Sequence, residues 1–201
     1  MSSRVITLPN FLTVIRMMLI PVFVTLLVYQ KFGWALFVFV AAGVTDGLDG
    51  LLARNLKQDS ELGRILDPIA DKLMLVTAFI ALSQHNLLPN PLPRHFPIPF
   101  WVTAAVISRD IFIIVGAAAI NIVTGFRGFR PSFLGKASTV VQICAIILVL
   151  VAVHVPWVSG YVLPTVYATV FLLAIASGIH YVFHASRLLN EKIERKIGVD
   201  G

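Results

Sequence analysis

Between Trp34 and Arg54 the chain reads WALFVFVAAGVTDGLDGLLAR, an apolar run that becomes polar toward its end. A helix of about 20 mainly apolar residues crosses the hydrocarbon core of a bilayer, and this run has that length. It nevertheless contains two carboxylates, Asp46 and Asp49. Ionisable groups are costly at such depth and usually serve a function or face a partner. The stretch therefore predicts a membrane helix that carries a polar site.

Five other segments have a similar length and hydrophobicity. The six expected spans are Leu8 to Tyr29, Trp34 to Arg54, Leu62 to Gln84, Phe100 to Val123, Phe133 to Val155 and Tyr161 to Ser186. They fill most of the 201 residues, so we expect one all-α integral membrane domain with six transmembrane helices over residues 1–201. Arg4 precedes the first span, as in a secretory signal peptide, but no small-residue cleavage site follows the apolar run. We therefore expect this helix to be retained.

Composition supports a membrane protein. Hydrophobic residues make up 58% of the chain and charged residues only 13%, whereas about a quarter of the residues are charged in ordinary soluble domains. The single Cys144 excludes a disulfide scaffold. The net charge of +6 is more typical of cytoplasmic loops and anionic lipid headgroups in such a chain than of nucleic-acid binding.

The distribution of Lys and Arg predicts the orientation. Two cations, Lys31 and Arg94, lie on one side of the expected spans. The eleven on the other side are Arg4, Arg54, Lys57, Arg64, Arg127, Arg130, Lys136, Arg187, Lys192, Arg195 and Lys196. Because cytoplasmic loops carry the excess of positive charge, we expect both termini in the cytoplasm and a multi-pass protein of the inner cell membrane.

Four aspartates form two pairs with helical spacing. Asp46 and Asp49 are three residues apart, and Asp67 and Asp71 are four apart in the next span, so each pair shares one helical face. A short connection makes the two spans antiparallel and can bring the pairs together. Four clustered carboxylates need cations to stay charged in a low dielectric. Oxygen-only ligands favour hard ions, and we expect a pair of Mg²⁺ or Mn²⁺ ions.

Two alternatives remain for these carboxylates. They can pair with the cations inside apolar segments, Arg16, Lys72 and Arg109, which themselves need partners. They can also form the ion or proton path of a transporter. Transporters often repeat such features in both halves of the chain, whereas these acidic pairs occur only in the first half. That asymmetry favours an enzyme.

The residues around the aspartates suit a phosphate substrate. Centres of two metal ions clamp the attacking and leaving oxygens of a phosphoryl displacement. Gly47, Gly50, Ala53 and Gly63 leave room near the backbone, and Arg54 offers a fork for phosphate oxygens. We therefore expect phosphoryl chemistry at a membrane surface.

The complete pattern resembles a known signature. It reads Asp46, two residues, Asp49-Gly50, two residues, Ala53-Arg54, eight residues, Gly63, three residues, Asp67, three residues, Asp71. Residues 46–71 thereby match every fixed position of the signature of the CDP-alcohol phosphotransferases, integral membrane enzymes with six transmembrane helices. Further stretches look like the family's first, fourth and fifth helices, namely Pro9-Asn10 with Thr13 and Arg16, Ser108-Arg109-Asp110, and Gly135-Lys136 through Gln142.

The resemblance implies a role for each matching residue. Asp46, Asp49 and Asp67 would bind the metal pair, and Asp71 would be the catalytic base and an additional ligand. The cytidine diphosphate site would be lined by Gly50, Ala53, Arg54 and Gly63. An anionic acceptor would meet a basic cluster of Arg109, Lys136, Arg127 and Arg130. The alternative for Arg127, Arg130 and Lys136 is that they only set the topology.

The resemblance also implies the reaction. A phosphatidyl group would pass from CDP-diacylglycerol to an alcohol, with release of CMP on the cytoplasmic side. Pro9-Asn10 and Gly135-Lys136 favour glycerol 3-phosphate as acceptor, which would give phosphatidylglycerophosphate. Arg130-Pro131-Ser132-Phe133 and Asp110 favour phosphatidylglycerol, which would give cardiolipin. We expect glycerol 3-phosphate to be the acceptor. We also expect membrane lipids as partners and no nucleic acid, and we leave open whether the protein forms a homodimer.

Overall fold

Six long helices make up the fold. The computed structural model describes the backbone of residues 8–56, 61–124 and 133–197, and the side chains of residues 13–45, 70, 72–116 and 133–183. The helices are α1 (Leu8–Val28), α2 (Phe32–Leu56), α3 (Glu61–Leu82), α4 (Phe100–Thr124), α5 (Phe133–Ala152) and α6 (Leu163–Ile197). Two short elements, η1 (His85–Leu87) and the π-helix η2 (Val158–Val162), lie in the connections before α4 and α6. No strand occurs within the described backbone ranges.

The prediction of an all-α fold with six helices is confirmed, and most bounds agree closely. The main difference is α6, which continues past Ser186 to Ile197. Hydrophobicity predicts only the part of a helix that matches the bilayer. The polar end of α6 contains Glu191 four residues before Arg195, a spacing that stabilises a helix in water as well.

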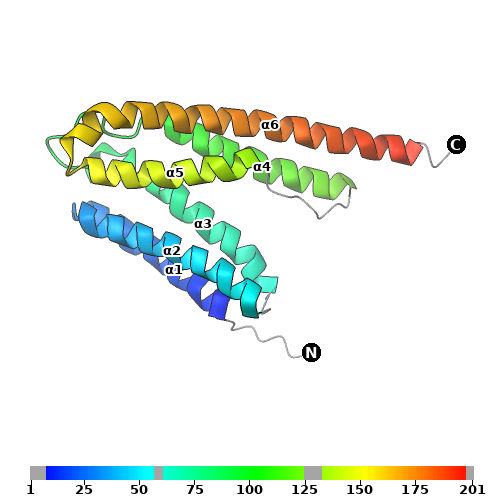
Figure 1. The fold of residues 1–201 in the computed structure, drawn as a ribbon, viewed down its shortest axis with the longest axis horizontal. Coiled ribbons are helices and arrows are strands. Elements are labelled where there is room, and N and C mark those ends of the chain that lie inside the picture. Colours follow the sequence, from blue (N-terminus) through cyan, green and yellow to red (C-terminus); the bar gives the residue numbers. More distant parts are fainter. Residues whose placement is uncertain (1–7, 57–60, 125–132, 198–201) are drawn as a thin grey trace.

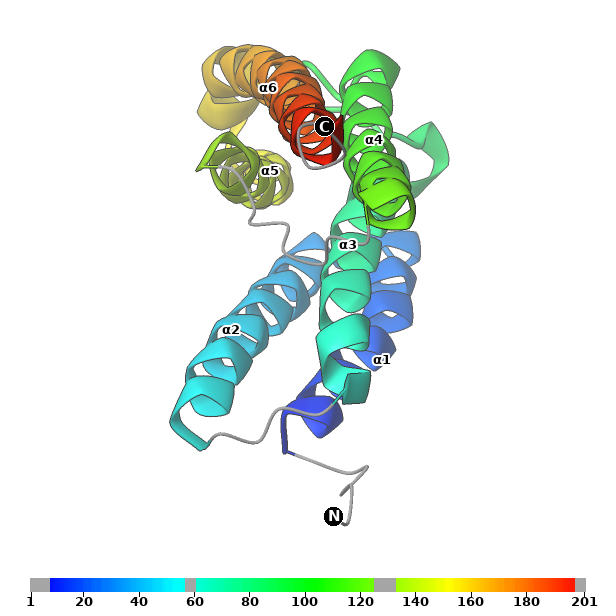
Figure 2. The same cartoon turned by 90° about the vertical axis from the view of Figure 1, so that its right-hand side faces the viewer.

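The helices form two groups. The first helix group consists of α1, α2 and α3, in which α1 packs against the other two. The second helix group consists of α4, α5 and α6, in which α4 and α5 pack against α6. Figure 1 shows α1, α2 and α3 running obliquely beneath the layer of α4, α5 and α6. Figure 2 shows α5 and α6 nearly end-on, with α1, α2 and α3 extending obliquely below them. Contacts of α5 with α2 and α3, and of α4 with α3, join the groups. Successive helices run in opposite directions. The end of α2 and the start of α3 therefore lie at the same end of the molecule as the end of α4 and the start of α5 (Figure 1).

An apolar core fills the opposite end of the molecule. Phe23 and Phe39 are buried with their ring centroids 5.9 Å apart. Leu82, Ile146 and Leu150 come from α3 and α5 and are fully buried. This core fixes the helices relative to one another, so that the end where α2 meets α3 is left for polar residues.

Large apolar side chains also point outward from all six helices. The exposed fraction is 65% for Met18, 64% for Phe37 and 80% for Phe100. Exposed apolar patches of this extent indicate contact with a membrane or a partner. Within the residues whose side chains are described, two stretches are long and apolar enough to cross a bilayer, Phe133–Ala152 and Val158–Phe183.

The connection between α3 and α4 is tied to the bundle at the core end. The Ile98 backbone N–H donates a hydrogen bond to the carbonyl of Leu82 at 3.1 Å. The Tyr167 hydroxyl on α6 donates one to the carbonyl of His95 at 3.2 Å. These contacts hold the connection at the end of the molecule far from the aspartates.

Candidate functional site

The four signature aspartates occupy matching levels of two antiparallel helices. Asp46 and Asp49 lie ten and seven residues before the end of α2 at Leu56. Asp71 and Asp67 lie ten and six residues after the start of α3 at Glu61. With a rise of 1.5 Å per residue, Asp46 and Asp71 are each about 15 Å from the connection, and the other pair about 10 Å. Helix register thus places the backbone of two aspartates at each level, and their side chains lie outside the described residues.

The donor set fits a hard divalent cation. All four groups are carboxylates, which are the ligands that Mg²⁺ and Mn²⁺ prefer, and they share two levels of one helix pair. Among the side chains that the structure describes, no group of three or more His, Cys, Asp or Glu residues occurs. The metal centre on α2 and α3 therefore stays a prediction that rests on residue type and helix register.

The residues expected around the cytidine diphosphate flank the same connection. Gly50, Ala53 and Arg54 lie in the last two turns of α2, and Gly63 lies in the first turn of α3. Ala53, Arg54 and Gly63 are nearer the connection than the aspartates, and Gly50 is at the same distance from it as Asp67. Their side-chain positions are outside the described residues, so their role stays a prediction.

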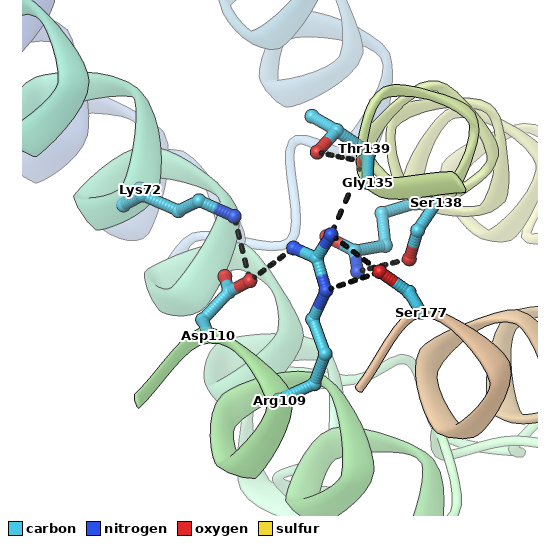
Figure 3. Close-up of polar contacts among 8 residues, drawn as sticks. Lys72, Arg109, Asp110, Gly135, Ser138, Thr139 and Ser177 are labelled. Carbon is cyan, nitrogen blue, oxygen red and sulfur yellow. Dashed lines mark hydrogen bonds and ion pairs between the residues drawn. The ribbon is translucent and has the colours of Figure 1, made fainter. Parts of the chain in front are cut away.

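A buried polar network lies between α3 and the second helix group. The Asp110 Oδ1 atom on α4 pairs with Lys72 Nζ on α3 at 2.7 Å and with Arg109 Nη1 at 2.6 Å. Figure 3 shows both cations converging on this carboxylate. We name Lys72, Arg109, Asp110, Gly135 and Ser177 the Asp110 network.

Arg109 extends the network to α5 and α6. Its Nε and Nη2 atoms donate to the Ser177 hydroxyl of α6 at 3.2 and 2.9 Å. Nη2 also donates to the Gly135 carbonyl of α5 at 3.2 Å (Figure 3). With the bond to Asp110, four hydrogen bonds use four of the five N–H groups of this guanidinium. Arg109 is thus held by protein groups.

Burial makes this charge balance important. The side chains of Arg109 and Asp110 are 6% and 5% exposed, and that of Lys72 is 31% exposed. Removing one partner of a buried ion pair leaves an uncompensated charge, which costs about 3–5 kcal/mol. The expectation that cations inside apolar segments need partners is confirmed for Lys72 and Arg109. Their described partner is Asp110, not a signature aspartate.

The sequence marks Asp110 only through the family resemblance, as part of a motif and as a residue that favours phosphatidylglycerol as acceptor. The rule that marked the other aspartates also applies to it, because Asp110 lies in the apolar run from Phe100 to Thr124. The sequence does not indicate which cations pair with Asp110. Lys72 and Asp110 are 38 residues apart, and only the packing of α3 beside α4 brings them together.

Two of the four expected acceptor cations, Lys136 and Arg109, lie at the same end of the molecule. Lys136 is exposed in the first turn of α5, directly after Gly135, whose carbonyl receives Arg109. Arg127 and Arg130 fall outside the described residues. The structure therefore places Lys136 beside the Asp110 network, and Arg109 within it.

A small cavity lies one helical turn deeper than the aspartates. Its volume is about 110 Å³, and its lining includes Arg16, Gly43, Leu75 and Thr139 from four helices. Gly43 is three residues before Asp46 on α2, and Arg16 is buried at 2% exposure. A Cβ atom added at Gly43 would meet nothing within 4 Å. The space beneath the site is therefore open on the α2 side.

Comparison with known proteins gives a consistent result. Residues 6–180 match the family model described as CDP-alcohol phosphatidyltransferase. The chain is 31% identical to a cardiolipin synthase (CMP-forming) from Streptomyces coelicolor, over 96% of this chain and 88% of that protein. It is 34% identical to a probable phosphatidylglycerophosphate synthase from Mycobacterium tuberculosis, over 92% of this chain and 84% of that protein.

A mammalian protein is similar as well. The cardiolipin synthase (CMP-forming) of Rattus norvegicus is 31% identical over 94% of this chain and 65% of its own length. These relatives are transferases of phospholipid biosynthesis, which decides against the transporter alternative. Together with the family model, they show that this chain belongs to the CDP-alcohol phosphatidyltransferase family.

Proposed function

We propose that the protein transfers a phosphatidyl group from CDP-diacylglycerol to glycerol 3-phosphate, forming phosphatidylglycerophosphate and CMP. The observation that carries this proposal is the complete signature at matching levels of α2 and α3, with Lys136 at the same end of the second helix group. The donor would bind to the first group and the anionic acceptor would approach from the second.

We further propose that all six helices cross the inner membrane and that the site faces the cytoplasm. Outward-facing apolar side chains on every helix support the first point. The excess of Lys and Arg at the aspartate end supports the second. The homodimer stays open, as it does from the sequence.

Asp46, Asp49, Asp67 and Asp71 would hold two Mg²⁺ or Mn²⁺ ions in this proposal. When bound, such ions neutralise the charge that develops on the attacked phosphate. The carboxylates of α2 and α3 would thus serve both as ligands and as a fixed frame for the diphosphate. Gly50, Ala53, Arg54 and Gly63 would bind the cytidine diphosphate nearer the helix connection.

Asp71 would act as the base. It would take the proton from the acceptor hydroxyl while that oxygen bonds to the phosphate carrying the diacylglycerol. The bond from this phosphate to the CMP oxygen breaks, and CMP leaves with its electron pair. Lys136 would attract the acceptor phosphate through charge-assisted hydrogen bonds, with Arg127 and Arg130 as further candidates. Arg109 would act from behind them, because Asp110, Ser177 and Gly135 hold its guanidinium.

Phosphatidylglycerol is the second candidate acceptor, which would make the protein a cardiolipin synthase. Relatives of both names match nearly the whole chain at similar identity, 31% and 34%. The two acceptors share a phosphoglycerol, so the same cations serve either.

The test is CMP release from CDP-diacylglycerol by the purified protein in lipid. We expect release that depends on glycerol 3-phosphate and yields phosphatidylglycerophosphate. Release only with phosphatidylglycerol would select the second candidate. No release with either acceptor, from folded protein supplied with Mg²⁺ or Mn²⁺, would reject both.

A further inference from the structure

The two helix groups carry different parts of the proposed reaction. The signature aspartates lie on α2 and α3, whereas Lys136 and Arg109 lie on α5 and α4. Catalysis needs the acceptor hydroxyl aligned with the donor phosphate, and a misplacement of 1 Å can lower the rate about 100-fold. Some contact must therefore fix the second helix group against α3 near the chemistry.

The Asp110 network makes that connection through direct contacts. Lys72 on α3 pairs with Asp110 on α4, and the same oxygen pairs with Arg109. Arg109 then donates to Gly135 on α5 and to Ser177 on α6. One carboxylate oxygen thus links α3 to all three helices of the second group.

The two ends of this path adjoin proposed functional residues. Lys72 directly follows Asp71, the proposed base, and Gly135 directly precedes Lys136, the proposed acceptor cation. Consecutive Cα atoms are about 3.8 Å apart, so a displacement of Lys72 or Gly135 would displace its functional neighbour. The network therefore joins the base side of the site to the acceptor side.

A purely stabilising role does not account for this arrangement. Buried ion pairs are often replaceable by apolar residues without loss of stability. In addition, the second Asp110 oxygen, Oδ2, is buried and accepts no hydrogen bond from the described residues. Unsatisfied buried polar atoms cost about 1–3 kcal/mol and need an explanation in a native structure. The chain thus keeps a costly carboxylate where an apolar contact would cost less, which points to a role beyond stability.

We propose that Asp110 is a positioning residue that holds Lys72 on α3 and Arg109 on α4 in register, and thereby aligns Asp71 with the acceptor site around Lys136. The inference rests on the proposed function, because it needs the donor on one helix group and the acceptor on the other. It predicts that weakening the Lys72–Asp110 pair raises the acceptor KM and lowers kcat, while donor affinity is kept.

The experiment compares Lys72→Met, Lys72→Arg, Asp110→Asn and the Lys72→Met/Asp110→Asn double variant in lipid-reconstituted full-length protein. For Lys72→Met we expect kcat/KM for the acceptor to fall about 10- to 100-fold, with the affinity for CDP-diacylglycerol within about twofold. Lys72→Arg keeps the charge and should recover most of the activity. The double variant should lose less than the product of the two single losses, because both remove the same contact.

Tyr167→Phe is the matched structural control. It removes an interelement hydrogen bond at the opposite end of the molecule, so it should lower thermal stability without changing the acceptor KM. Wild-type kinetics in folded Lys72→Met, or equal losses of donor and acceptor affinity, would overturn the inference. If Asp110→Asn does not fold, the two Lys72 variants still decide. Wild-type protein inactive with every acceptor would instead reject the proposed function.

Discussion

Gly116 on α4 lies against the ring of Tyr181 on α6. A Cβ atom at Gly116 would be 2.7 Å from the Tyr181 Cε1 atom, closer than real Cβ contacts come. The absence of a side chain at this position is therefore what lets the two helices approach. Gly43 on α2 provides the contrast, because a Cβ atom there would meet nothing within 4 Å.

Gly116→Ala should destabilise the protein, whereas Gly43→Ala should not. Overpacking costs about 1–3 kcal/mol, and Ala gains up to about 1 kcal/mol over Gly in a helix at either position. The two variants should therefore differ by about 1–3 kcal/mol. Thermal unfolding in detergent, with Tm values compared at one protein concentration, measures the difference. Equal Tm values would mean that Tyr181 has room to move.

Activity should require a divalent cation. Four carboxylates at two levels of one helix pair need cationic compensation, and the proposed reaction needs charge neutralisation. EDTA should abolish CMP release, and adding back Mg²⁺ or Mn²⁺ should restore it. Full turnover in metal-free buffer would contradict the proposed centre.

Asp49→Asn should lose metal binding together with catalysis. The amide keeps the shape of the side chain but removes the ligand charge. Binding of Mn²⁺, followed by electron paramagnetic resonance, measures the loss. Tyr167→Phe is the control, because it removes only a hydrogen bond to the His95 carbonyl at the opposite end of the molecule, and it should keep its Mn²⁺ affinity. A wild-type Mn²⁺ affinity in Asp49→Asn would show that this ligand is wrongly assigned.

Asp71→Asn should separate the base from the ligands. Loss of a positioned base lowers turnover by about 10²- to 10⁴-fold, while donor binding should be largely kept. Asp46→Asn, at the same level of α2, should weaken the binding of metal and donor as well. Single-turnover CMP release together with donor affinity tests both variants. Near-normal turnover in Asp71→Asn, or a loss confined to donor affinity, would remove the base role.

Lys136→Gln should raise the acceptor KM with little effect on the donor. A hydrogen bond to a charged group contributes about 1.5–3 kcal/mol, which corresponds to a change of about 10- to 100-fold. Lys31→Gln is the control, since Lys31 is an exposed lysine in the connection between α1 and α2 at the other end of the bundle. If both variants keep the wild-type acceptor KM, Lys136 only contributes to topology.

The sequence predicts helices better than partners here. The starts of α4 at Phe100 and of α5 at Phe133 are predicted correctly from the apolar runs, since each expected span begins at the same residue as the helix. The end of α6 is missed because helix propensity continues after the apolar residues stop. The need of Lys72 and Arg109 for a partner is also predictable from their depth. That both use one oxygen of Asp110 is not, since it depends on how helices far apart in sequence cross.

The shared oxygen of Asp110 also limits how the family can vary in evolution. A relative that replaced this acid alone would keep two cations, at positions 72 and 109, facing each other in a site that is 5% exposed at its centre. Removing one partner of a buried pair costs about 3–5 kcal/mol, a large part of the stability of an ordinary domain. Loss of the acid should therefore occur in lineages that have also lost the lysine at position 72 or gained an acid elsewhere against Arg109. Three positions on two helices are thus expected to change as a set rather than one at a time.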